Sequence, residues 1–121
     1  GRGLKPDWVC KDDRQFADIF RRTFGQALLL APPPQGISAG GICYRNVITP
    51  KTVVVLGRVG AEPVLVFVDR AEADAVGQSV APDTGLKLYK RTIGKLVAYE
   101  LSHLDRAFVL DLLREPAPNG G

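Results

Sequence analysis

The sequence predicts an α+β fold, in which a mixed or antiparallel sheet of about five to six strands carries an N-terminal helix and a short C-terminal helix. Two observations indicate this class: an apolar stripe at helical spacing lies early in the chain, and Val-rich segments separated by hairpin-sized turns follow it. Helices and strands do not alternate as in a doubly wound parallel sheet. We therefore expect one domain over residues 7–115, with loose termini at 1–6 and 116–121.

The first helix is expected to begin near Asp12, because an Asp can cap a helix and carboxylates favour its first turn. Gly25 stands where a left-handed C-terminal cap is wanted. We interpret the apolar stripe as core, since no cofactor ligand lies beside it; its residues are Phe16, Ile19, Phe20 and Phe24.

The strands begin with a short segment at Ala27–Ala31, which three prolines stop because proline lacks a backbone donor. A strand follows at Ile37–Tyr44, where Gly40 and Gly41 indicate a bulge or a close backbone approach.

The clearest strands are Thr52–Val59 and Val64–Asp69, which the turn at residues 60–63 should join as an antiparallel hairpin. Neighbouring positions are apolar in Val53–Leu56 and in Val64–Val68. Both faces of the sheet should therefore lose water at these central strands.

One or two helical turns are expected at Arg70–Val76, before a second hairpin of Leu86–Ile93 and Leu96–Ser102 around Gly94 and Lys95. Its inward residues are predicted to be Tyr89, Val97, Tyr99 and Leu101.

A final short helix is expected after Asp105, which can serve as its cap. One side of this helix would be apolar, formed by Phe108, Val109, Leu112 and Leu113.

The net charge of +3 is too small to mark a nucleic-acid-binding protein unless the basic residues cluster. The strongest cluster lies in the second hairpin and is interpreted as a solvated face: Lys87, Lys90, Arg91 and Lys95. We expect no nucleic-acid partner.

No apolar run of the sequence, Val53–Leu56 included, is long enough to span a bilayer, and the N-terminus has no basic segment followed by an apolar one. We expect no membrane contact within this chain. Because it starts with Gly and contains no Met, we expect a tag remnant or a fragment of a longer protein, which leaves the compartment open.

The chain shows no metal or cofactor signature, because it has one His and two widely separated cysteines, Cys10 and Cys43. Two inert thiols are expected for this pair, and a disulfide is the alternative outside the cytoplasm. The glycines at 36–41 lack the lysine and hydroxyl of a phosphate loop.

Residues of the hydrolase triad types occur close together at Ser102, His103 and Asp105, but adjacent strand residues point to opposite faces. Cys10 and His103 could form a thiolate–imidazolium pair, although a simple hydrogen bond at a strand end is the preferred interpretation for His103. Glu100, an acid in an apolar run, is expected to be outward-facing or paired. No catalytic, cofactor-binding or metal-binding residue is assigned.

Two stretches, Thr52–Arg70 and Lys95–Asp105, resemble the non-catalytic C-terminal domain of some bacterial membrane-anchored anti-sigma-factor-like proteins. The resemblance extends over Trp8–Leu113 and implies an extracytoplasmic position beyond a membrane anchor. The zinc-binding His and Cys cluster usual in the anti-sigma module is absent from this sequence, which argues against direct sigma binding.

Together these features favour a non-enzymatic regulatory or protein-interaction domain. Two helices can cover only limited area of a sheet that is apolar on both faces, so we expect a protein partner or a homodimer through an apolar sheet face. The alternative is a small ligand-binding or catalytic domain that uses Cys10 or His103.

Overall fold

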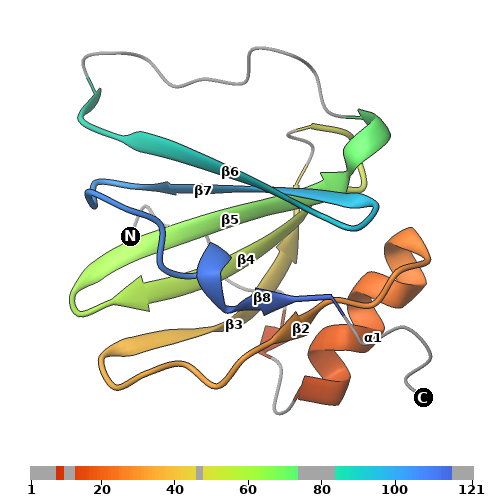
Figure 1. Ribbon diagram of the computed structural model, residues 1–121, viewed down its shortest axis with the longest axis horizontal. Coiled ribbons are helices and arrows are strands. Elements are labelled where there is room, and N and C mark those ends of the chain that lie inside the picture. Colours follow the sequence, from red (N-terminus) through yellow and green to blue (C-terminus); the bar gives the residue numbers. More distant parts are fainter. Residues whose placement is uncertain (1–7, 10–12, 46–47, 74–83, 116–121) are drawn as a thin grey trace.

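The computed structural model describes residues 8–9, 13–45, 48–73 and 84–115, and over these residues the chain is an α+β fold (Figure 1). A six-stranded antiparallel sheet has the strand order β1-β3-β4-β5-β7-β6, and β2 pairs with β8 in a second, two-stranded sheet. The elements are β1 (Trp8–Val9), α1 (Asp13–Phe24), β2 (Leu29–Leu30), β3 (Ile37–Tyr44), β4 (Val53–Val59), β5 (Glu62–Arg70), β6 (Lys87–Ile93), β7 (Leu96–Ser102) and β8 (Leu113–Arg114), with 3₁₀ turns at Ala71–Ala73 and Leu110–Leu112. The predicted fold class is confirmed.

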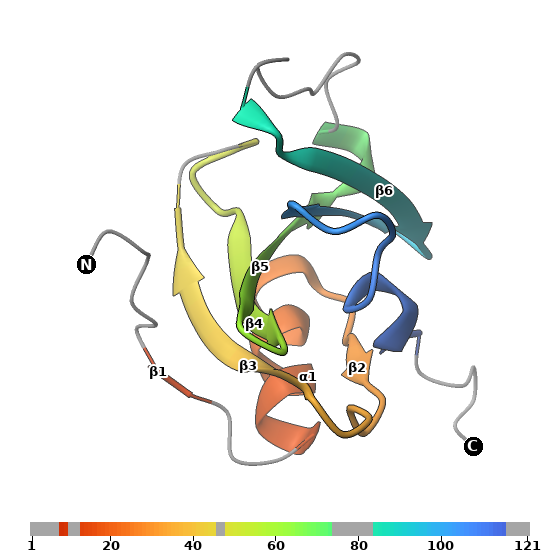
Figure 2. The ribbon, with the colours of Figure 1, turned by 90° about the vertical axis from the view of Figure 1, so that its left-hand side faces the viewer.

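Helix α1 packs against one face of the main sheet, which curves around it (Figure 2). The predicted aromatic stripe makes this contact: Phe16, Ile19 and Phe20 are buried, and Phe24 packs beside them. Gly25 ends the helix with a φ of 80°, and its N–H donates to the Arg21 carbonyl at 2.9 Å. The predicted stripe and cap are therefore confirmed, whereas Asp12 lies outside the described residues.

The two predicted hairpins are present, β4 with β5 and β6 with β7. In the first hairpin the strands continue further than expected: Val59 pairs with Glu62, so the turn contains Gly60 and Ala61 only. Glycine at residue 60 has a φ of 60°, which such tight turns require. The shorter turn brings Glu62 into the sheet.

Strand β3 contains the predicted bulge, because its register with β4 shifts between Ala39 and Gly41. The short strand expected at Ala27–Ala31 is reduced to β2. Of the helical turns expected at Arg70–Val76, Ala71–Ala73 form a 3₁₀ turn, Arg70 belongs to β5 instead, and residues 74–76 lie outside the described part of the chain.

Both faces of the central strands are apolar, as predicted. The face toward α1 carries one set of valines: Val53, Val55, Val64, Val66 and Val68. The opposite face carries Val54 and Cys43, which are also fully buried.

Of the predicted inward residues of the second hairpin, Val97 and Tyr99 are buried, but the four do not share one face of the sheet. Register pairs Leu101 with Leu65 and Tyr99 with Phe67, which places Val97, Tyr99 and Leu101 on the sheet face opposite α1. Tyr89 lies on the α1 side. The β7 residues of that side are Leu96, Ala98 and Glu100, because alternate strand residues point to opposite faces.

The C-terminal helix is a single 3₁₀ turn that leads directly into β8, and its N-terminal flanking residue is Val109. Asp105 does not cap it, because its carboxylate forms an ion pair with Lys87 at 2.8 Å. Of the predicted apolar side, Val109 and Leu113 are buried against the core, whereas Phe108 and Leu112 are half-buried. Leu110, which the prediction did not include, is buried as well. Pairing of β8 with β2 replaces the further helical turns.

Within the described residues, no helix combines the length and apolar character needed to cross a membrane. The termini predicted at 1–6 and 116–121 lie outside the described residues.

Candidate functional site

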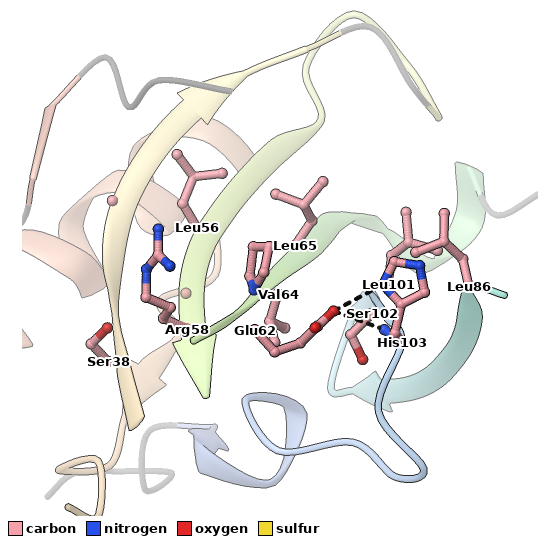
Figure 3. Close-up of a pocket in the computed structure, with 13 residues that line it drawn as sticks. Ser38, Leu56, Arg58, Glu62, Val64, Leu65, Leu86, Leu101, Ser102 and His103 are labelled. Atoms are coloured by element: carbon pink, nitrogen blue, oxygen red, sulfur yellow. Dashed lines mark hydrogen bonds and ion pairs between the residues drawn. The ribbon is translucent and has the colours of Figure 1, made fainter. Parts of the chain in front are cut away.

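An open groove of about 680 Å³ lies on the face of the sheet opposite α1 (Figure 3). Its apolar lining consists mainly of leucines that are only half-buried: Leu56, Leu65, Leu86 and Leu101. We call this feature the leucine groove. Half-exposed leucines that lie side by side on one sheet face make it the strongest candidate for a binding site in the described chain.

The sheet register explains why these leucines meet. Leu56 of β4 pairs with Leu65 of β5, which pairs in turn with Leu101 of β7. Paired residues on neighbouring antiparallel strands have Cβ atoms about 5 Å apart. The three leucines therefore form a continuous row across three strands. At the end of the row, Leu56 pairs with Gly41 of β3, which has no side chain.

One rim of the groove carries Arg58, which lies on the same face of β4 as Leu56 (Figure 3). Its side chain is exposed, and its Nη1 donates to the carbonyl oxygen of Ala61 at 3.4 Å. Ser38 of β3 pairs with Arg58 and also lines the groove.

The other rim carries a hydrogen-bonded pair, Glu62 at the start of β5 and His103 just after β7 (Figure 3). The Nδ1 atom of His103 is 2.9 Å from Oε2 of Glu62, and the backbone N–H of His103 donates to the same oxygen at 3.3 Å. The hydrogen bond from the His103 side chain lowers the pKa of Glu62. His103 thus makes the ordinary strand-end hydrogen bond expected for it.

The residues of the possible triad do not converge. Ser102 is buried, and its hydroxyl accepts a hydrogen bond from the Leu104 N–H at 3.1 Å. His103 pairs with Glu62, and Asp105 pairs with Lys87. Three separate sets of partners leave no nucleophile–base–acid relay here.

The alternative of a small ligand-binding or catalytic domain uses Cys10 or His103, and the described structure does not test a pairing of the two. His103 lines the leucine groove, but Glu100 is on the face toward α1 and Cys10 lies outside the described residues. The Cys43 side chain is fully buried.

Of the two expected arrangements, outward-facing or paired, Glu100 has the second, because it is 0% exposed. It is paired, but with backbone amides: Oε2 accepts from the Phe108 N–H at 2.8 Å and Oε1 accepts from the Leu110 N–H at 2.7 Å. Burial raises the pKa of Glu100, and the amide hydrogen bonds oppose that increase. This carboxylate stabilises the C-terminal turn.

Lys87, Lys90 and Lys95 of the basic cluster are exposed to solvent, as predicted, but the cluster does not share one face of the sheet. Lys87 pairs with Asp105, and Lys90 lies over the Tyr99 ring with its Nζ 5.7 Å from the centroid. Arg91 lies on the sheet face opposite Lys90, where it is half-buried and donates to the Leu110 and Leu113 carbonyls. Strand alternation divides the cluster, so it supplies no continuous cationic patch.

Within the described ranges, no three His, Cys, Asp or Glu side chains gather as potential metal ligands. Comparisons of the chain with protein-family models, with curated proteins and with solved structures give no match. A function must therefore be inferred from the leucine groove itself.

Sequence reasoning missed this groove as a site, although the leucines are plain in the sequence. The sequence pattern identifies Leu56 and Leu65 only as parts of apolar strands. The available signal was the combination of an apolar second face with charged residues at strand ends, Arg58 and Glu62. Only the register between strands shows that the leucines share one surface.

Proposed function

We propose that this chain is a non-enzymatic protein-interaction domain that holds an apolar segment of a partner protein in the leucine groove. The observation that carries the proposal is the row of half-exposed leucines across three neighbouring strands. Contiguous exposed apolar surface on a folded domain usually marks an association site.

A binding role fits the rim better than a catalytic one. His103, the single histidine of the sequence, already bonds to Glu62 through Nδ1. The nearby Ser102 hydroxyl is buried and hydrogen-bonded to the main chain. Nucleophilic catalysis needs a base within hydrogen-bond reach of the nucleophile, and these two side chains bond elsewhere.

A protein segment suits the groove better than a small molecule. The volume is within the range of small-ligand pockets, but such pockets bury most of their ligand, whereas this groove is open at the sheet surface. An extended segment can contact the leucines with alternate side chains and leave the others in water.

The resemblance to anti-sigma-factor-like proteins supplies a context for this role. In that context the domain is the extracytoplasmic part of a membrane-anchored regulator, and the groove is where it contacts another protein. A regulator of this kind acts by association, which needs no cofactor.

The proposal is tested by NMR titration of the ¹⁵N-labelled chain with an acetylated and amidated Leu-Val-Leu peptide carrying a Gly-Ser tail. We expect saturable shifts at the amides of Leu56, Leu65 and Leu101. The Leu65→Asp variant should lose these shifts, because a carboxylate would then occupy the centre of the groove. Thr92→Asp is the matched control, since Thr92 is exposed on the same sheet face but does not line the groove.

Shifts that persist in Leu65→Asp, or that map to a different face, would contradict the proposal. Absence of saturable binding by this peptide, and by versions of it that carry one added charged residue, would also contradict the proposal.

A further inference from the structure

We infer that the segment bound in the leucine groove carries a carboxylate side chain beside its apolar residues, and that Arg58 binds this carboxylate. The inference rests on the proposed function and specifies the chemistry of the partner. It depends on the charges and hydrogen bonds at the two rims of the groove.

Arg58 has unused capacity as a donor. A guanidinium carries five N–H donors, and within the described chain the hydrogen bond of Arg58 is the one to Ala61 at 3.4 Å, near the outer limit for such a bond. No described carboxylate forms an ion pair with it. An arginine with unused N–H donors and no carboxylate partner is suited to bidentate binding of a carboxylate.

The nearest acid in the same hairpin is committed elsewhere. Glu62 follows Arg58 across the tight turn, yet its Oε2 accepts both the side-chain and the backbone hydrogen bonds of His103. The two rims therefore differ in character: the acid of one is satisfied within the domain, and the cation of the other remains for a ligand.

Ser38 adds a second donor on the Arg58 side. It pairs directly with Arg58 in the β3–β4 register, and both side chains line the groove. Paired residues lie about 5 Å apart at Cβ, close enough for a hydroxyl and a guanidinium to contact one carboxylate. Both side chains are exposed and so accessible to a partner.

The geometry also gives the length of the segment. The leucine row spans two gaps between strands, about 10 Å, which about three residues of extended chain can cross. Arg58 is two positions beyond Leu56 on the same strand, so it lies next to one end of the row. The acid should therefore be adjacent to a run of about three apolar residues.

The test compares three acetylated and amidated peptides with the same Leu-Val-Leu core and Gly-Ser tail, in which Glu, Gln or Lys adjoins the core. Each is made with the variable residue before and after the core. In at least one orientation we expect the Glu peptide to bind about threefold to fivefold more tightly than the Gln peptide, and the Lys peptide to bind most weakly.

Arg58→Glu should reverse this order, so that the Lys peptide binds best. Arg70→Glu is the control with the same change in charge, since Arg70 is exposed at the far end of β5 and does not line the groove. It should leave the order unchanged. A reversed order in both variants would show a general charge effect and overturn the inference.

The outcomes separate the two proposals. Equal binding of all three peptides at the leucine groove would overturn the role of Arg58 and leave the interaction function standing. Absence of binding by every peptide would overturn the function itself. Decanoate is tested in parallel as a simple amphiphile, and tighter binding of decanoate than of any peptide would overturn the assignment to a protein segment.

Discussion

Glu100 shows how a single buried residue organises a neighbouring segment. Its oxygens accept hydrogen bonds from the backbone of Phe108 and Leu110, and these N–H groups belong to the chain that leads into the C-terminal turn. Orphan amides at the start of a helical turn need an acceptor, and here it comes from a strand rather than from a local cap. The carboxylate replaces the Asp105 cap that the sequence favoured.

The raised pKa of Glu100 leads to a prediction about stability and pH. Its folded pKa lies above the ordinary value of 4.5, so the folded chain binds this proton more tightly than the unfolded chain does. The contribution of Glu100 to the free energy of unfolding therefore falls as the pH rises from 4.5 through the raised pKa. We expect the stability of wild type relative to Glu100→Gln to decrease across that interval.

Urea unfolding of both proteins from about pH 4 to about pH 7 measures this difference. Across the whole range Glu100→Gln should also be less stable by about 1–3 kcal/mol, because its amide NH₂ faces backbone donors. Glu72→Gln, at an exposed position, is the control and should show neither effect. A stability difference that rises with pH would contradict the assigned direction.

At the scale of elements, two glycines are required for different reasons. Gly25 ends α1 with a φ of 80°, although a Cβ there would meet nothing within 4 Å. Gly57 has no such φ, but a Cβ on it would lie 2.8 Å from the Ser38 carbonyl oxygen and 3.3 Å from Cγ2 of Val109. The first position demands a backbone conformation, and the second demands space.

Alanine at either position should destabilise the chain. We expect Gly25→Ala to cost about 1 kcal/mol of unfolding free energy, from left-handed strain. Gly57→Ala should cost about 1–3 kcal/mol, because β3 or the C-terminal turn must move. Chemical denaturation measures the unfolding free energy of both variants. The costs should be nearly additive in the double variant, since a Cβ at residue 25 would touch none of the atoms that a Cβ at residue 57 would meet. Wild-type stability for Gly57→Ala would show that the strands separate more easily than this packing implies.

At the scale of the whole molecule, the fold protects one thiol completely. The Cys43 side chain is 0% exposed on β3. In a Cys10→Ser background, which leaves Cys43 as the single thiol of the chain, we expect no reaction with a thiol reagent until denaturant is added, and one thiol per chain afterwards. Rapid reaction of the native protein would contradict this burial.

The oligomeric state also tests the choice of partner. Since we assign the leucine groove to a segment of another protein, light scattering of the isolated chain at micromolar concentrations should give the mass of a monomer, close to 13.1 kDa. A dimer that Leu65→Asp dissociates and Thr92→Asp does not would assign the groove to a second copy instead.

What could be predicted from the sequence was mainly local. The spacing of Phe16 and Phe20, the position of Gly25 and the two hairpin turns follow from backbone preferences and hydrophobic periodicity, which act over a few residues. The apolar second face of the sheet was also predictable, because consecutive valines must point both ways.

The tertiary structure decided everything that depends on register. Leu56, Leu65 and Leu101 become neighbours only through strand pairing, and the same pairing directs Glu100 toward α1. Single-strand patterns do not specify which distant residues pair, because a shift by one position moves each side chain to the other face. Most elements were therefore determined by the sequence locally, whereas the C-terminal turn with β8 and the candidate site were determined by packing.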